Sequence, residues 1–328
     1  MDYAKRNEIT SGGFKNSLNK TVTSASEIGT FANVYLILKF GSLDDFNNFS
    51  ASEWLKDQAN FQSARYNYQD TYYALAGLNL ISPGNISDTE KNFIYEKFQE
   101  KNIISKFKPN GSDIPTIATT YYGLMIYTYL GKADVLSYDD IGSYVTTMYD
   151  ADIGGFKSHS SGEVSVESTY FAIKMLTQMN LLSLLTETQK TEIKTYVKTF
   201  YVNDSLYKEQ YGGYARSQNN PISSLSMTFY CTQILSDLGE KPSEETKNWI
   251  LSLQDASGGF KETFSDGTIL PTAISTYYAV ATLELTNYTF DDQVFKFEIS
   301  PWWIAAIVII IVLAIAGIIY GIYYYKNR

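Results

Sequence analysis

Two acidic side chains lie where they could act on a bound ligand. Glu167 and Asp70 each come one or two residues before a threonine that begins an apolar stretch. A carboxyl group held at such a helix start can serve as a general acid, and two opposed carboxylates can hydrolyse a glycosidic bond. We name Glu167 and Asp70 as the candidate catalytic residues.

Chemistry that depends on thiols or imidazoles finds little support in this sequence. The chain has one cysteine, Cys231, and one histidine, His159. Neither an internal disulfide nor a zinc site built from Cys and His can therefore form. Cys231 falls in an apolar helical stretch, where we expect a small buried side chain, and His159 falls in a Ser/Gly loop, where we expect solvation. We predict no metal and no cofactor.

The elements that must position these residues repeat along the chain. Six threonines are each followed by one or two bulky residues and an apolar helical stretch, at spacings of 41, 49, 49, 59 and 48 residues. A fixed period in this range indicates a repeat architecture, because one unit alone cannot bury its apolar face. The six are Thr30, Thr71, Thr120, Thr169, Thr228 and Thr276.

The sequence pattern of each repeat unit predicts an outer helix, then a loop, then an inner helix. The outer helices alternate apolar and charged residues at helical spacing, and their expected N-caps are Ser50, Ser87, Ser137, Thr186 and Ser243. The loop carries an aromatic residue 10 to 16 positions before the threonine. It reads Gly12-Gly13-Phe14, Gly154-Gly155-Phe156, Gly212-Gly213-Tyr214 and Gly258-Gly259-Phe260, while units two and three keep only Phe61 and Phe107.

Six such pairs favour closure into a ring, since an open solenoid would need polar caps at both ends. We therefore predict an all-α protein, an α/α toroid in which about six helix-pair repeats close into a ring. Only eleven residues precede Gly12, too few for a full outer helix. Either further chain precedes them, or the ring closes with eleven helices.

The start of each inner helix carries an aromatic side chain at an equivalent place. Such residues either pack the core or form the mouth of a central cavity that receives a lipid tail, a glycan or a peptide. We name all six as candidate ligand-binding residues: Phe31, Tyr72, Tyr121, Tyr170, Phe229 and Tyr277.

The C-terminal part of the sequence predicts a transmembrane helix over residues 302–325. The 22 residues from Ile304 to Tyr325 include no charge, and aromatic residues flank both ends, as is typical of a bilayer-spanning helix. The predicted organisation is a toroid over 1–287, a linker over 288–301, the membrane helix over 302–325 and a short basic tail over 326–328.

The charges around this span bear on its orientation. The basic tail predicts a cytoplasmic C-terminus and an extracytoplasmic domain. Because the first ten residues contain no apolar signal segment, a tail anchor with a cytoplasmic domain stays open. Residues 1–301 carry 24 basic and 35 acidic side chains, and this acidic balance argues against a nucleic-acid partner.

The Gly-Gly-Phe loop followed by a Thr-aromatic helix resembles the α/α-toroid repeats of the protein prenyltransferase β-subunit and terpene cyclase superfamily. The stretches GGFKETFSDGTILPTAISTYYAV and GGFKSHSSGEVSVESTYFAI carry the resemblance, which covers about residues 12–287. The resemblance implies a toroid fold, and it implies an isoprenoid substrate if the catalytic residues of the superfamily are present.

The chain departs from the catalytic motifs that the resemblance implies. Where protein prenyltransferases have an Asp-x-Cys zinc motif, this chain has Glu167-Ser168-Thr169, and Met227 stands at the place of the histidine. No carboxylate precedes Thr120 or Thr276, where type II terpene cyclases have an Asp-rich acid motif. The candidate cations for a diphosphate are Lys15, Lys157, Lys261 and Arg216, which we expect to be solvated.

These departures favour a membrane-anchored, non-catalytic toroid at the cell surface that binds a ligand or a protein partner. The alternative is an enzyme of the prenyltransferase or terpene cyclase type that acts on an isoprenoid at the membrane, with Glu167 or Asp70 as an unrecognised acid. A carbohydrate-active α/α barrel, in which these two carboxylates oppose each other, is the third hypothesis.

Overall fold

The computed structural model describes residues 1–10, 12–60, 67–84, 86–109, 112–264 and 269–290. The chain divides into two compact units, Met1–Tyr288 and Thr289–Arg328. The second unit is described only at Thr289 and Phe290, so the predicted membrane helix over 302–325 and the basic tail over 326–328 lie outside the described residues. Within the described residues, no helix is long and apolar enough to cross a membrane.

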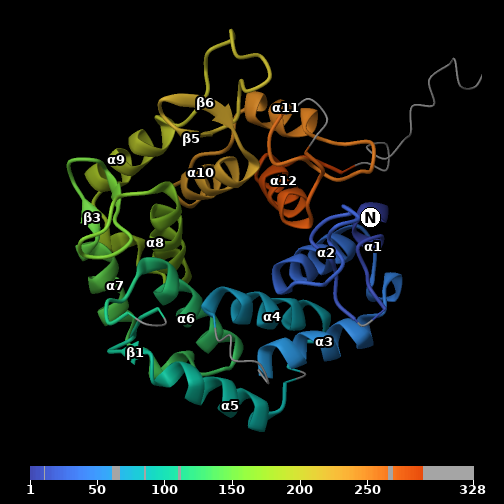
Figure 1. Ribbon diagram of the computed structural model, residues 1–328. Coiled ribbons are helices and arrows are strands. Elements are labelled where there is room, and N and C mark those ends of the chain that lie inside the picture. The colour runs from blue at the N-terminus through green and yellow to red at the C-terminus, as the bar shows by residue number, and fades with distance from the viewer. Residues whose placement is uncertain (11, 61–66, 85, 110–111, 265–268, 291–328) are drawn as a thin grey trace, which may run out of the picture. The chain divides into compact units, whose positions relative to one another are not determined.

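The first unit is a closed ring of helices in two concentric layers (Figure 1). Each inner helix contacts the next, and the last contacts the first, which confirms the predicted toroid. The inner helices of the described chain are α2 (Glu27–Phe40), α4 (Tyr68–Ile81), α6 (Ile117–Tyr129), α8 (Val166–Gln178), α10 (Leu225–Asp237) and α12 (Ala273–Leu285).

The outer helices follow one another around the ring in chain order. The first of them is a single helical turn, because few residues precede the first loop. The outer helices are α1 (Asp2–Lys5), α3 (Asn48–Asn60), α5 (Asp88–Gln99), α7 (Tyr138–Thr147), α9 (Glu187–Lys198) and α11 (Glu244–Ser252). Short 3-10 turns occur at η1 (Leu43–Asp45), η2 (Ala133–Val135) and η3 (Leu182–Leu184).

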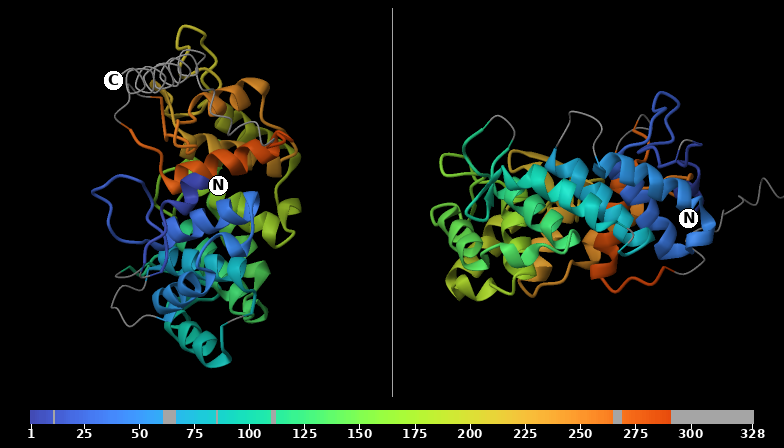
Figure 2. Two further views of the ribbon diagram at one scale, coloured as in Figure 1. Left: turned by 90° about the vertical axis from the view of Figure 1, so that its right-hand side faces the viewer. Right: turned by 90° about the horizontal axis from the view of Figure 1, so that it is seen from below.

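Three small antiparallel hairpins lie in the loops that lead from outer to inner helices. They pair β1 (Asn102–Ile103) with β2 (Lys106–Phe107), β3 (Tyr149–Asp150) with β4 (Gly155–Phe156), and β5 (Ala215–Ser217) with β6 (Asn220–Ser223). Seen from the side, these loops stand on one face of the ring (Figure 2). The N-terminal ends of the inner helices therefore all open toward that face.

Side-chain caps fix where the helices begin. The expected outer caps Ser87, Ser137, Thr186 and Ser243 are confirmed. Ser50 is wrong, because α3 begins at Asn48 and the side chain of Asn47 accepts the Ser50 N–H. The inner helices have caps that the sequence analysis missed, each four residues before a repeat threonine: Ser26, Asn67, Thr116, Ser165, Ser224 and Thr272.

The repeat threonines tie the loops to the inner helices. All six are buried. In each unit whose loop aromatic is described, the threonine Oγ1 accepts the backbone N–H of that aromatic, at 2.9–3.2 Å. The donors are Phe14, Phe107, Phe156, Tyr214 and Phe260, and the acceptors are Thr30, Thr120, Thr169, Thr228 and Thr276. Phe61, predicted for the remaining unit, lies outside the described residues.

The glycine pairs let each loop pack against the next outer helix. Gly212 adopts a left-handed φ of +96°, and a Cβ there would lie 2.4 Å from the Glu245 carbonyl oxygen on α11. At Gly259, a Cβ would lie 2.7 Å from the ring of Tyr3 in α1. The four-residue helix α1 thus packs against the last loop, in the place that the next outer helix takes in the other repeats.

Hydrogen bonds and an ion pair join the last repeat to the first. The Tyr3 hydroxyl donates to the Pro271 carbonyl at 2.9 Å, and the Ala273 N–H donates to the Asn16 carbonyl at 2.7 Å. At the other end of these helices, Glu284 of α12 pairs with Lys39 of α2. Because these contacts join residues about 250 positions apart, the ring closes by specific bonding as well as by packing.

Replacement of Thr169 by valine tests the bond between loop and helix. Valine keeps the shape but leaves the buried Phe156 N–H without its acceptor, which lies 3.0 Å away. We expect the free energy of unfolding, measured by denaturant titration, to fall by about 1–3 kcal/mol. The control is Thr195→Val on the exposed face of α9, which should change stability by about 0.5 kcal/mol or less. Equal losses in the two variants would contradict the assignment.

Candidate functional site

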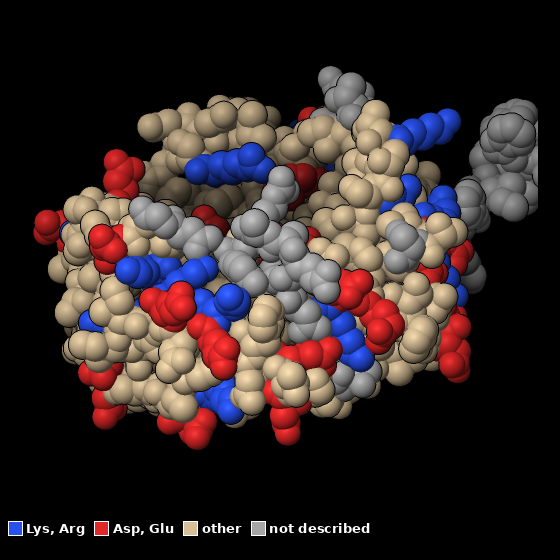
Figure 3. Space-filling view, turned by 60° about the horizontal axis from the view of Figure 1, so that its bottom comes forward, with Lys and Arg blue, Asp and Glu red and all other residues tan. Residues whose placement is uncertain are grey.

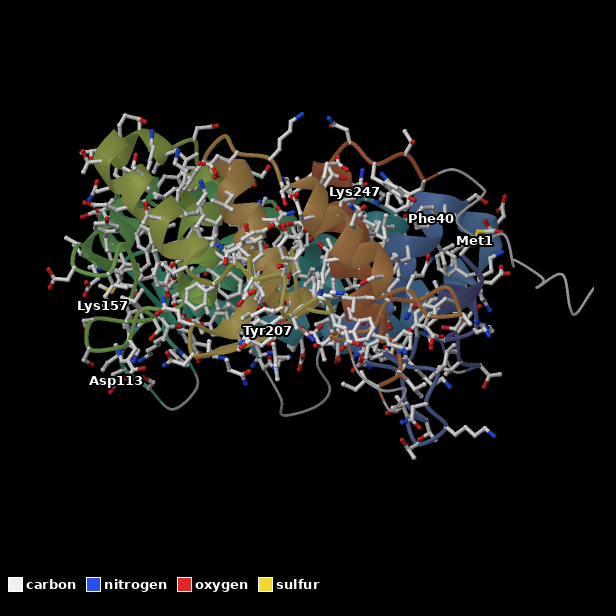
Figure 4. All side chains as sticks on the ribbon, turned by 90° about the horizontal axis from the view of Figure 1, so that it is seen from above. Met1, Phe40, Asp113, Lys157, Tyr207 and Lys247 are labelled. Atoms are coloured by element: carbon white, nitrogen blue, oxygen red, sulfur yellow. The ribbon has the colours of Figure 1, made fainter. Side chains whose placement is uncertain are left out.

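The candidate site is the mouth of the ring at the N-terminal ends of the inner helices. Figure 4 shows Asp113 and Lys157, in loops that lead into α6 and α8, on one side of the ring and Phe40, at the end of α2, on the other. The loop side is hollowed at its centre, and acidic side chains are visible inside the hollow (Figure 3). The two candidate acids and the six candidate aromatic residues come from helices that begin at this mouth.

Eleven aromatic side chains surround the axis of the ring. The structure places all six predicted aromatics there, Phe31, Tyr72, Tyr121, Tyr170, Phe229 and Tyr277, together with Tyr73, Tyr122, Phe171, Tyr230 and Tyr278. We call this set the aromatic ring. The space left between these side chains has a volume of about 30 Å³, which is room for about two water molecules.

The aromatic ring is continuous because rings of neighbouring inner helices touch. The ring centroids of Tyr121 and Phe171 lie 4.9 Å apart, and those of Phe229 and Tyr278 lie 4.5 Å apart in a stacked arrangement. Phe31 contacts Tyr277 edge-on at 5.2 Å and so joins the first helix to the last. Edge-to-face and offset contacts at these separations are the favourable geometries for aromatic pairs.

Sequence reasoning found only half of the aromatic ring. It assigned the residue directly after each threonine to the central wall, but the next residue also faces the axis in every unit except the first, where Ala32 replaces it. The signal was present, since α2, α6 and α12 are apolar on nearly all sides. A helix of that kind is buried on most faces, so consecutive residues both reach the core.

The tyrosines of the aromatic ring are held neutral. Burial raises the pKa of Tyr73, Tyr121 and Tyr170 well above the usual value near 10, because the phenolate would lose its hydration. Tyr72, Tyr230 and Tyr278 shift in the same direction for the same main reason. These hydroxyls can donate and accept hydrogen bonds, but they do not ionise near neutral pH.

Glu167 lies in the mouth beside the aromatic ring. It is the second residue of α8. Burial is the main cause that raises the pKa of Tyr122 and Tyr230, and the charge of Glu167 adds to it. The side chain is reachable by water, yet the surrounding wall removes part of its hydration and raises the pKa of the Glu167 carboxyl. A carboxyl with a raised pKa is suited to donate a proton.

Asp70 serves a different purpose at the start of α4. One oxygen of its carboxylate accepts a hydrogen bond from the Asn67 side chain at 2.6 Å, at the N-cap of the helix. Desolvation raises the pKa of the Glu27 carboxyl on α2, and the negative charge of Asp70 raises it further. It does not contribute to the pKa shift of Glu167, which desolvation alone causes. The two candidate acids thus differ in their surroundings, since Asp70 bonds to the helix cap and Glu167 is partly desolvated.

Cys231 and His159, the side chains that could ligate a soft metal ion, do not form a metal site. Cys231 is fully buried, and burial raises the pKa of its thiol. His159 is half-buried in its loop, 3.4 Å from the Ser161 hydroxyl. Within the described part of the chain, no cluster of three or more His, Cys, Asp or Glu side chains could hold a metal ion.

Three of the four cations considered for diphosphate binding are engaged by acids. Lys157 pairs with Asp150 at 2.9 Å. Arg216 pairs with Glu262 at 3.2 Å, and Lys261 lies 3.9 Å from Asp255. A diphosphate would have to displace these partners, so the described geometry offers no ready cationic cluster at the mouth.

A match to a protein-family model shows the family of this chain. Residues 50–205 and 200–304 match the prenyltransferase alpha-alpha toroid domain. The chain belongs to this family. A comparison with curated protein sequences found no match.

Solved structures with the same toroid fold include enzymes of two kinds. Protein geranylgeranyltransferase-I of Candida albicans, complexed with GGPP, is 17% identical with a TM-score of 0.63, over 80% of this chain and 84% of that one. A type II terpene cyclase from Scytonema in its apo form is 10% identical with a TM-score of 0.55, over 87% of this chain and 94% of that one. A variant of that cyclase with its product, merosterolic acid A, gives 11% identity, a TM-score of 0.55 and the same coverage. At these identities the likeness concerns the fold alone.

Replacement of Glu167 by glutamine tests the electrostatics of the mouth. An acid with a raised pKa binds protons more tightly in the folded state, so stability falls as pH rises from the usual pKa near 4.5 toward the folded value. A glutamine at position 167 does not ionise, so the variant does not lose stability in this way as the pH rises. We expect the Tm of Glu167→Gln to exceed that of the parent at pH 7, by on the order of 1 °C for a chain of this size, and to match it at acid pH below the usual glutamate pKa.

A control of opposite sign is available on the outer layer. Lys190 lowers the pKa of the Glu187 carboxyl, so Glu187→Gln should lower the Tm at pH 7 rather than raise it. Thermal melts at both pH values measure both variants. A lowered Tm for Glu167→Gln at pH 7 would contradict the desolvated position assigned to this carboxyl.

Proposed function

We propose that this chain is a non-catalytic toroid, held at a membrane by residues 302–325, that binds a ligand or a protein partner at the mouth of its ring. The observation that carries the proposal is the filled centre of the ring. Pockets for small molecules usually measure about 300–1,000 Å³, whereas the space inside the aromatic ring measures about 30 Å³. The aromatic ring is then the floor of the mouth and the core of the toroid.

The chemistry of the mouth supports the same proposal. Protein prenylation in this family needs a zinc-activated thiolate, and the chain has Glu167, Ser168 and Thr169 where the zinc motif would stand. The buried thiol of Cys231 is not available to a metal at the mouth. A surface that holds acids and paired lysines can bind a partner without performing a reaction.

The membrane anchor is the second part of the proposal and rests on the sequence. The uncharged stretch from Ile304 to Tyr325 is long enough to cross a bilayer, and Trp302 and Trp303 precede it. We propose an extracytoplasmic domain, with a tail-anchored cytoplasmic domain as the alternative that the same residues allow.

An enzyme of the prenyltransferase or terpene cyclase type is the second candidate function, and one observation favours it. Glu167, the second residue of α8 at the mouth, combines a raised pKa with a charge that acts on Tyr122 and Tyr230, which suits a general acid for an isoprenoid. The similar Candida albicans enzyme is complexed with GGPP, so geranylgeranyl diphosphate is the appropriate substrate to test. For such a chain to enter, the aromatic ring would have to open.

The proposal is tested with the full chain recovered from cell membranes in detergent. We expect the protein to remain with the membranes after alkaline extraction, as a spanning helix requires. We expect the purified protein to consume no geranylgeranyl diphosphate, because the centre of the ring has no room for it. Radiolabelled substrate and product extraction measure the turnover.

The comparison variants separate the two candidate functions. Turnover that Glu167→Gln abolishes, while the exposed-site variant Glu187→Gln retains it, would overturn the non-catalytic proposal and favour the enzyme. Release of the full chain by alkaline extraction would overturn the anchor, whatever the result of the turnover assay.

A further inference from the structure

One loop of the ring is longer than its counterparts and builds a pocket of its own. The spacing from Thr169 to Thr228 is 59 residues, about ten more than in most of the other repeats. The additional residues follow α9 and lead into the hairpin of β5 and β6. Between them lies a pocket of about 120 Å³, four times the volume of the space inside the aromatic ring and room for about ten water molecules.

The frame of this pocket is fixed by hydrogen bonds. The Trp249 indole N–H donates to the Glu209 carbonyl at 3.0 Å, and the Gln210 side chain accepts the Ser223 N–H at 2.9 Å. The Val202 N–H donates to the Gly213 carbonyl at 2.9 Å. The inserted loop is therefore held against α11 and β6, so the pocket is formed before any ligand arrives.

The lining of the pocket combines aromatic surface with hydrogen-bonding groups, of which one is a carboxylate. Phe200, Tyr201 and Tyr207 supply the aromatic surface, and Tyr207 is 48% exposed at the opening. Thr199, Asn203, Asp204, Ser217 and Gln218 supply hydroxyl, amide and carboxylate groups. Gln218 is already oriented, since its amide nitrogen donates to the Thr199 hydroxyl oxygen at 2.7 Å.

This lining selects among classes of ligand. The lining residues include Asp204 but no lysine, arginine or histidine, so the lining itself offers an anion such as phosphate no cationic partner. A purely apolar ligand would remove water from Asn203, Asp204 and Gln218 without replacing their hydrogen bonds. A ligand with several hydroxyl groups and one apolar face satisfies both parts of the lining.

We propose that this pocket, which we call the insertion pocket, binds a single neutral sugar unit. The hydroxyl groups of the sugar would exchange hydrogen bonds with Asn203, Asp204 and Gln218, while its apolar face lies against Tyr207. Figure 4 shows Tyr207 on the same side of the ring as Asp113 and Lys157, so the insertion pocket opens on the loop side that also carries the mouth. Its sugar binding does not depend on whether the toroid is catalytic.

The test uses the full chain in a detergent without a sugar headgroup. Expression in a bacterial host keeps Asn203 unmodified, since Asn203-Asp204-Ser205 is an N-glycosylation sequon. D-glucose, D-galactose, D-mannose and N-acetyl-D-glucosamine are titrated separately, with saturation-transfer NMR as the readout. We expect saturable binding of at least one sugar and a loss of about tenfold in affinity for Tyr207→Ala and for Gln218→Ala.

Tyr138→Ala is the matched control, because Tyr138 is a similarly exposed tyrosine on α7 that does not line the insertion pocket. Its affinity for the sugar should equal that of the parent. The proposal is overturned if none of the four sugars binds saturably, or if Tyr207→Ala and Gln218→Ala bind as tightly as Tyr138→Ala. Binding of inorganic phosphate or choline in preference to every sugar would also overturn it.

Discussion

A buried threonine hydroxyl that accepts the backbone N–H of a loop aromatic is the interaction on which the rest of this toroid depends. The loop must pass close to the next outer helix, so its backbone amide is cut off from water and needs an acceptor inside the protein. Thr169 shows the complete arrangement: its Oγ1 accepts from Phe156 N–H and its hydroxyl donates to the Ser165 carbonyl at 2.7 Å. One side chain thereby joins a loop, a helix cap and an inner helix.

The position of this bond determines what fills the centre of the ring. Once the threonine fixes the start of an inner helix, the next two residues project toward the axis, where six helices of the described chain converge. Tyrosine and phenylalanine at those positions pack against each other around the ring. The centre of the ring is therefore lined by aromatic side chains, and the function proposed for this chain is placed at the mouth and the loops.

Much of the fold could be predicted because it repeats. The period of the threonines, the glycine pairs and the outer caps all describe local geometry, and the copies of each signal along the chain reinforce each other. Ser50 failed because Asn47 offers an equivalent cap a few residues earlier. The site was harder to predict, because the volume inside a ring and the desolvation of Glu167 depend on side chains from six separate helices. The insertion pocket left only one trace in the sequence, the long spacing before Thr228.

The central claim, that aromatic side chains pack the middle of the ring and bury its tyrosines, is tested most directly by an NMR titration of tyrosine rings labelled with carbon-13 in the native protein. The account predicts that Tyr121 and Tyr170 keep neutral-phenol shifts up to a pH of about 11, above the usual pKa near 10, and ionise only when the protein unfolds. Free tyrosine in the same samples serves as the reference. If Tyr121 and Tyr170 ionise together with the reference while the fold is intact, water fills the centre and the account is contradicted.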